Sequence, residues 1–94
     1  MKIVNIEIKP DTLQKFLWKH QVTEQEVRQA LRNKPKIRFH QRGNIKGEDL
    51  YVALSRTDAG RYLTLFFIYK LNHVALVISG RDMDSSERNR YAKK

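Results

Sequence analysis

"LYVALSRTDAGRYLTLFFIYKLNHVALVIS", residues 50–79, decides the fold, because it reads as three strands in succession. In the first segment, LYVAL, the side chains of Leu50, Val52 and Leu54 alternate with those of Tyr51 and Ala53, which is the two-residue period of a strand. The second, RYLTLFFIYK (61–70), is apolar on both faces, which is typical of a central strand, and HVALVIS (73–79) follows it. The connections TDAG and LN are short enough for hairpins, so we expect an antiparallel β-meander.

A strand and a first helix are predicted at the start of the chain. KIVNIEI (2–8) alternates apolar and polar side chains, which indicates a strand. After Pro10, Asp11 can act as an N-cap with Gln14 three positions on. Apolar residues at helical spacing then predict a helix that ends near His20.

The clearest local signal lies in VTEQEV (22–27), which predicts the start of a second helix. Thr23 and Glu26 have the spacing of a capping box, and the two valines have that of a hydrophobic staple. Pro35 ends this helix, because proline disfavours helical geometry at the residue before it. The two helices therefore form a hairpin, and the inner face of the second is predicted to comprise Val27, Ala30 and Leu31.

The remaining elements complete an α+β pattern. KIRFH (36–40) predicts a weaker strand before the meander, and Asp84 with Glu87 predicts a capped polar helix that ends near Tyr91. We expect residues 1–94 to form a single domain: an N-terminal strand, a two-helix hairpin, an antiparallel β-meander and a short C-terminal helix.

Charge and composition narrow the classes of function. Nineteen Lys and Arg against ten Asp and Glu leave a net charge of +9, which favours polyanionic partners. The absence of cysteine excludes a disulfide framework, a thiol nucleophile and a thiolate metal site. The longest apolar run is too short to span a membrane, and the N-terminal residues lack a signal-peptide pattern. We therefore expect a cytoplasmic protein with no membrane partner.

Most of the excess charge lies in one basic stretch, residues 28–46, which has no acidic residue. Phosphate-backbone binding and a merely solvated surface are both consistent with such a run. The basic residues of this stretch are Arg28, Arg32, Lys34, Lys36, Arg38, Arg42 and Lys46.

Three blocks of the chain resemble the BrnT toxins of the RelE/ParE-like group of toxin–antitoxin ribonucleases. KHQVTEQEV (19–27) resembles the family's Lys-His, short turn and acid-rich second helix. GEDLYVALSRTDAGRYLTLFF (47–67) resembles its hairpin. ISGRDMDSSERNRY (78–91) resembles its closing signature of Ile-Ser-small-Arg, then Glu-Arg and a Tyr four positions after that Glu. The resemblance implies a RelE/ParE-like fold.

This resemblance implies a toxin that cleaves RNA and is neutralised by a cognate antitoxin, with which it forms a hetero-oligomer. Such cleavage requires activation of the ribose 2′-OH, stabilisation of phosphate charge and protonation of the leaving oxygen. It requires no metal ion, and we expect no cofactor. The candidate catalytic residues are Arg81 as phosphate ligand, Glu87 as base and Tyr91 as acid or stacking platform. The alternative is that Glu87 caps its helix and pairs with Arg81, while Tyr91 packs that helix on the sheet.

Further residues are candidates for RNA binding. Arg56 and Arg61 flank the TDAG bend and are expected to lie near one another. The other cationic candidates are Lys36, Arg38, Arg42 and Lys46. If one sheet face is open, aromatic side chains can also stack bases; otherwise they belong to the core, and those concerned are Tyr51, Tyr62, Phe66 and Tyr69.

A partner and a second function are also considered. We expect an acidic antitoxin segment to lie over the basic stretch. The family's Trp-Asp is not recognisable in IEIKPD (6–11), and Leu76 stands where many members have a basic residue. A non-catalytic binding module, either a degenerate toxin scaffold or an inhibitor of a protein target, is therefore the alternative.

Overall fold

The computed structural model describes residues 1–93 and has an α+β fold, so the predicted class is confirmed. Its five strands form one mixed sheet, and the first of three helices continues into a π-helical turn. None of the helices in this part of the chain is long and apolar enough to cross a membrane. The elements in order are β1 (Asn5–Ile8), α1 (Pro10–Lys15), η1 (Phe16–His20), α2 (Glu24–Arg32), β2 (Lys36–Gln41), β3 (Leu50–Arg56), β4 (Tyr62–Tyr69), β5 (Val74–Asp82) and α3 (Ser85–Ala92).

The strand order in the sheet is β1-β5-β4-β3-β2. Strands β2 to β5 are successive antiparallel neighbours, whereas β1 pairs in parallel with β5, with Asn5 opposite Val74. The alternating pattern of residues 2–8 predicts a strand, but it contains no signal for this distant parallel partner. Strand β5 also continues to Asp82, beyond the segment 73–79 that the sequence predicts.

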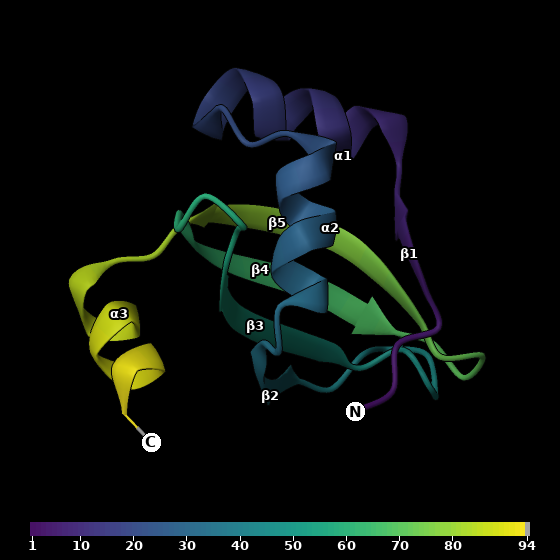
Figure 1. The fold of residues 1–94 in the computed structure, drawn as a ribbon. Coiled ribbons are helices and arrows are strands. Elements are labelled where there is room, and N and C mark those ends of the chain that lie inside the picture. The colour runs from purple at the N-terminus through teal and green to yellow at the C-terminus, as the bar shows by residue number, and fades with distance from the viewer. Residues whose placement is uncertain (94) are drawn as a thin grey trace.

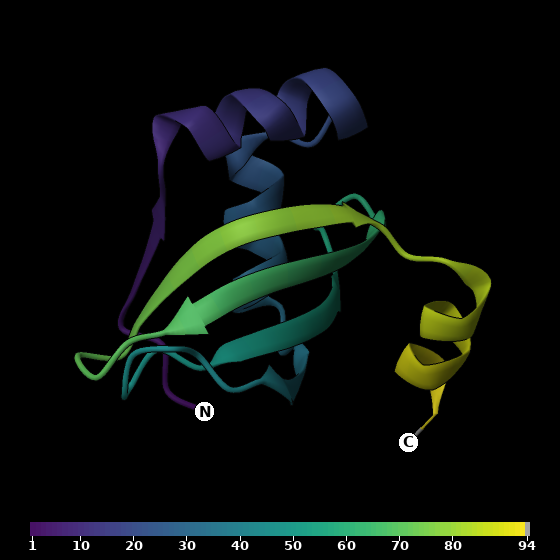
Figure 2. The ribbon, with the colours of Figure 1, turned by 180° about the vertical axis from the view of Figure 1, so that it is seen from behind.

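The helices divide the sheet into two unlike faces. Helices α1, η1 and α2 lie over one face, here called the helix-covered face (Figure 1). Seen from behind, the other face carries no helix except α3, which lies at the end where β5 leaves the sheet (Figure 2). We call it the open face. The core lies under α1, η1 and α2, and its members include Phe16, Val22, Val27, Leu63, Leu65 and Phe67.

Capping boxes start two of the helices, as predicted. The Glu26 N–H donates to Thr23 Oγ1 at 3.1 Å, and the Thr23 N–H donates to Glu26 Oε1 at 3.0 Å. Asp84 and Glu87 make the same pair of bonds at the start of α3. The predicted inner face of α2 is also confirmed, since Val27, Ala30 and Leu31 are all buried.

The first helix differs from the prediction at its start. It begins at Pro10, and the capping residue is Lys9, which makes no side-chain capping bond. Asp11 therefore lies inside the first turn, not at the N-cap. The reason is that proline suits the first helical position: its ring sets φ and it has no N–H to satisfy. At the other end, the Val22 N–H donates to the Phe16 carbonyl at 3.0 Å and closes the helix.

Gly80 lets this helix pack closely on β5. A Cβ atom at position 80 would lie 3.0 Å from Phe16 Cε1 and 2.7 Å from Leu65 Cδ2. Both distances are shorter than ordinary contacts between carbon atoms. The absence of a side chain at Gly80 therefore allows the Phe16 ring to reach the core.

Candidate functional site

The open face combines an apolar floor with basic margins. Side chains alternate along each strand, so the pairing of β2 to β5 assigns every second residue to this face. None of the side chains that these four strands direct to it is a carboxylate. They include Lys36, Arg38 and His40 from β2, Leu50, Val52, Leu54 and Arg56 from β3, Tyr62, Thr64, Phe66 and Ile68 from β4, and Leu76, Ser79 and Arg81 from β5.

Two tyrosines and three cations meet where α3 touches the open face. The Arg88 guanidinium lies 4.4 Å from the Tyr62 ring centroid, and the Arg56 guanidinium lies 5.5 Å from it. The Tyr91 ring meets Tyr62 edge-on at 5.9 Å, and Lys36 Nζ is 5.7 Å from the Tyr91 ring. We call these five residues the tyrosine–cation cluster. Four of them, Lys36, Arg56, Tyr62 and Tyr91, are among the candidate residues that the sequence analysis names.

Phe66 links this region to the middle of the open face. The His40 ring from β2 meets the Phe66 ring edge-on at 5.4 Å between centroids. The Arg81 guanidinium from β5 lies 5.9 Å from the same ring. An aromatic ring with a cation and an imidazole nearby is a suitable surface for an unstacked base.

Arg81 and Glu87 form a bidentate ion pair beside the tyrosine–cation cluster. Arg81 Nη1 and Nη2 donate to the two Glu87 carboxylate oxygens at 2.6 and 2.8 Å. The Thr64 hydroxyl and the Asp84 N–H also donate to Glu87 Oε1, at 2.9 and 3.0 Å. The Glu87 side chain is 7% exposed and that of Arg81 is 37% exposed. The pair thus joins β5, β4 and α3.

This environment sets the charge state of Glu87. Burial acts to raise the pKa of the carboxyl, but hydrogen bonds from Arg81, Asp84 and Thr64 outweigh it and lower the pKa to about 2. The hydrogen bond with Glu87 likewise raises the pKa of Arg81 above its usual value. A carboxylate of such low pKa, with both oxygens already bonded, is a poor proton acceptor at neutral pH. The contacts are those of the structural alternative, in which Glu87 caps α3 and orients Arg81.

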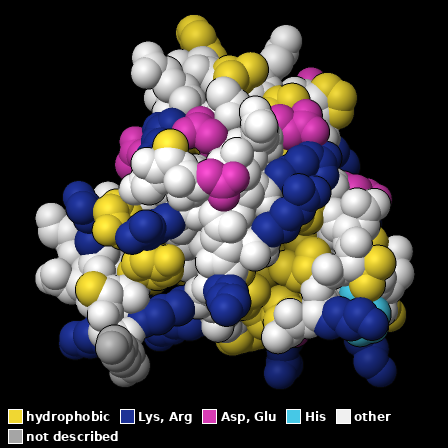
Figure 3. All heavy atoms as spheres, in the orientation of Figure 1, with side chains coloured by type: hydrophobic (Ala, Val, Ile, Leu, Met, Phe, Trp, Pro, Cys, Tyr) yellow, Lys and Arg dark blue, Asp and Glu magenta, His cyan; other side chains and the backbone are white. Residues whose placement is uncertain are grey.

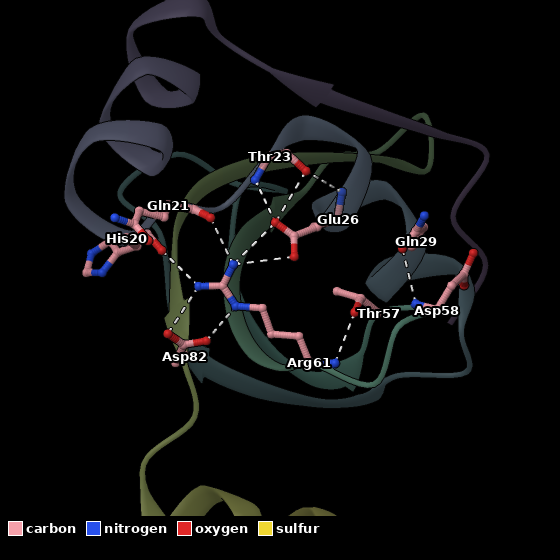
Figure 4. A network of polar contacts seen from close by, with 9 residues as sticks. All are labelled: His20, Gln21, Thr23, Glu26, Gln29, Thr57, Asp58, Arg61 and Asp82. Atoms are coloured by element: carbon pink, nitrogen blue, oxygen red, sulfur yellow. Dashed lines mark hydrogen bonds and ion pairs between the residues drawn. The ribbon is translucent and has the colours of Figure 1, made fainter.

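Arg61 has a role that the sequence does not reveal. Its Nε and Nη2 donate to the Asp82 carboxylate at 2.7 and 3.1 Å (Figure 4). Its Nη1 and Nη2 also donate to the carbonyls of Gln21 and His20 at 2.9 and 2.8 Å. Glu26 completes the set, with both carboxylate oxygens 3.3 Å from Nη1. The hydrogen bond to Asp82 raises the pKa of Arg61 and lowers that of Asp82.

The side chains of Arg56 and Arg61 lie on opposite faces of the sheet, although the hairpin predicts that they lie near one another. Arg56 is opposite Tyr62 in the β3–β4 pairing and lies over its ring on the open face. Arg61 is the neighbour of Tyr62 and reaches Glu26 of α2 on the helix-covered face. The structure gives Arg61 a scaffolding role, because its guanidinium ties the end of the first helix to α2 and β5.

The other predicted cations are spread along the chain. Arg38 is exposed on β2, and Arg42 borders a hollow of about 270 Å³ whose floor includes Ile68 and Ile78. Lys46 lies beyond this hollow, in the β2–β3 connection next to the β4–β5 turn. Lys36 also donates from Nζ to the carbonyls of Arg90 and Lys93, which fixes the end of α3.

The four aromatic candidates for base stacking do not lie on the same face of the sheet. Tyr51 and Tyr69 pack against the core, whereas Tyr62 and Phe66 belong to the open face. The sequence reasoning misses Arg88 and His40, because only the third dimension brings them to these rings. Within residues 1–93, no three His, Asp or Glu side chains come together as a metal ion would require.

Comparison with known proteins gives no assignment. No protein-family model matches the chain, and no curated protein matches it either.

Proposed function

We propose that this protein is a BrnT-like toxin with a RelE/ParE-like fold, which binds single-stranded RNA on its open face and cleaves it. In this proposal a cognate antitoxin neutralises the toxin. The observation that carries the proposal is the tyrosine–cation cluster, where two tyrosine rings and three cations lie on a sheet face whose strands contribute no carboxylate. The resemblance of residues 78–91 to the family's closing signature supports the same function.

The cluster suits RNA for two physical reasons. Lys36, Arg56 and Arg88 can neutralise successive phosphates, and the release of counterions then favours binding. The rings of Tyr62, Tyr91 and Phe66 offer apolar surfaces for stacking, and single-stranded RNA has unstacked bases that can use them. Double-stranded nucleic acid lacks such accessible base faces.

For cleavage, Arg81 is the residue that we propose as phosphate ligand. Its planar guanidinium stabilises the charge that grows on the phosphate, and Glu87 holds it in place through two hydrogen bonds. Glu87 is therefore a positioning residue in this proposal. Tyr91, one turn further along α3, serves as the proton donor or as a stacking platform.

Reversing two charges of the cluster should weaken RNA binding. The double substitution Arg56→Glu with Arg88→Glu is expected to reduce affinity for a labelled single-stranded RNA about tenfold or more, because two phosphate contacts become repulsive. Fluorescence anisotropy at fixed salt measures this. Lys9→Glu with Lys15→Glu makes the same charge change in exposed residues at the two ends of α1 and should alter affinity no more than about twofold. Equal losses in both variants would show that only net charge matters.

Purified protein incubated with RNA in the presence of a metal chelator should cleave it. Arg81→Ala is expected to lower the cleavage rate about tenfold or more, because the charge on the phosphate loses its main ligand. Arg81→Lys keeps a cation beside Glu87 but cannot make two parallel bonds, so it should fold and still lose activity. Arg90→Ala, an exposed change on α3, is the matched control. Circular dichroism of each variant verifies folding.

The second candidate function is a non-catalytic binding module. The hydrogen bonds of Glu87 favour this function. Both of its carboxylate oxygens are already bonded, so Glu87 is not free to act as a base beside Arg81. Intact RNA at high protein excess, together with RNA binding that depends on Arg56 and Arg88, would support this function and exclude the ribonuclease. Tight binding of a protein target without any RNA affinity would exclude the RNA proposal altogether.

A further inference from the structure

A large hollow lies on the helix-covered face, away from the tyrosine–cation cluster. It has a volume of about 610 Å³ and is bounded by the N-terminal residues with β1, by the last turns of α2 and by the start of β2. Figure 3 shows its apolar surface in yellow, below α2 and beside the N-terminal segment, with dark-blue Lys and Arg side chains around it. We call this hollow the α2–β1 groove.

The floor of the α2–β1 groove is apolar and without a partner. Ile3, Leu31 and Ile37 line it, together with Tyr51, and they belong to the core cluster or pack against it. Val4 also lines it and is 63% exposed. A binding partner could bury these side chains further, which favours association.

The rim of the groove is cationic. Arg28, Arg32 and Lys34 line it, and no acidic residue among the described positions 1–93 does. Arg28 is already engaged, because it donates to Glu24 at 2.8 Å and to the Ile6 carbonyl at 3.1 Å. Arg32 and Lys34 are exposed, and Lys34 has a φ of 52°, the left-handed conformation that turns the chain from α2 into β2.

We propose that the α2–β1 groove binds a short peptide segment that carries both acidic and apolar side chains. The apolar side chains bury themselves on Ile3, Leu31 and Ile37, while the carboxylates meet Arg32 and Lys34 at the rim. A nucleic acid fits less well, because the floor is mainly aliphatic and offers few rings for stacking. The inference rests on the proposed function, since the segment would anchor the antitoxin to the groove, while other antitoxin residues would block the open face.

The position of the groove gives the inference a specific consequence. The sequence suggests one acidic partner over the whole basic stretch, but the fold divides that stretch between two faces. Arg28, Arg32 and Lys34 line the groove, whereas Lys36 and Arg38 belong to the open face. An acidic peptide and RNA should therefore bind at the same time, with neither displacing the other.

Fluorescence anisotropy with a synthetic labelled peptide rich in glutamate and leucine tests this inference on the full chain. Arg32→Glu with Lys34→Glu should weaken peptide binding about tenfold or more and change RNA affinity by no more than about twofold. Arg56→Glu with Arg88→Glu, which makes the same charge change, should do the reverse. Val4→Ser, at an exposed position of the groove floor, should also weaken peptide binding without unfolding the protein.

Control ligands separate the inference from its competitors. A glutamate and serine peptide should bind weakly because it has nothing to bury, and a lysine and leucine peptide should not bind because of charge repulsion. Equal loss of peptide binding in both charge-reversed variants, or displacement of the peptide by RNA, would overturn the inference. So would binding of anionic lipid vesicles in place of the peptide. Loss of RNA binding alone would refute the proposed function and leave the groove intact.

Discussion

Replacing Glu87 with glutamine is expected to lower the free energy of unfolding at neutral pH by about 3 kcal/mol. Glutamine keeps the size and the capping position of Glu87, but it removes the charge that receives both Arg81 hydrogen bonds. The loss is large because the carboxylate is buried, and its partners stabilise the ionised form specifically. Urea unfolding followed by circular dichroism measures the difference.

The same difference should depend on pH with a definite sign. The pKa of Glu87 is lowered in the folded protein from 4.5 to about 2. The stabilisation is therefore fully present above about pH 5 and is lost as the pH falls through about 2. Wild type and Glu87→Gln should approach equal stability as the pH falls below about 2, because the wild-type carboxyl then becomes protonated as well.

Glu24→Gln is the matched control for this prediction. Glu24 also accepts a hydrogen bond from an arginine, Arg28, but its side chain is 46% exposed. Its substitution should change the free energy of unfolding by no more than about 0.5 kcal/mol, as exposed helix ion pairs do. A Glu87→Gln variant that is as stable as the Glu24→Gln variant at every pH would refute the buried ion pair.

Arg61→Ala is expected to lower the free energy of unfolding by about 2 kcal/mol, because several hydrogen bonds are lost together. The substitution leaves the Asp82 carboxylate without its main partner, and it leaves the carbonyls of His20 and Gln21 without donors. These carbonyls end the first helix, where intrahelical donors are missing. The first helix should therefore loosen before the sheet does, which hydrogen exchange of amides in residues 10–20 would detect.

Two further variants show whether the geometry of Arg61 matters. Arg61→Lys should recover only part of the stability, because an ammonium cannot donate in parallel to Asp82 and still reach the helix end. Arg56→Ala, on the other side of the same bend, should cost no more than about 0.5 kcal/mol because Arg56 is exposed. RNA affinity should show the reverse order: the Arg56→Ala variant should bind RNA more weakly, and the Arg61→Ala variant should bind it as the wild type does. If Arg61→Ala weakened RNA binding while stability stayed constant, the scaffolding role would be wrong.

Local signals in the sequence were sufficient to predict most of the helices and strands. The capping boxes at Thr23 and Asp84 each involve residues three positions apart, so their physics is complete within one turn. The buried face of α2 follows from helical spacing, and the strands from 36 to 79 follow from alternation and apolar runs. The net charge and the absence of acidic residues from 28–46 are likewise properties of the sequence alone.

The tertiary structure decided how these residues divide between the faces of the sheet. Arg61 and His20 are 41 positions apart, and no local pattern links a guanidinium to the carbonyl that it will meet. The same holds for β1 and β5, and for Glu87, whose burial depends on Thr64 and Arg81 from two strands. Side-chain period and capping act over a few residues, whereas desolvation and charge pairing depend on which distant segments the packed core brings together. That is why the sequence indicated a basic stretch, and only the fold separated it into an open face and a groove.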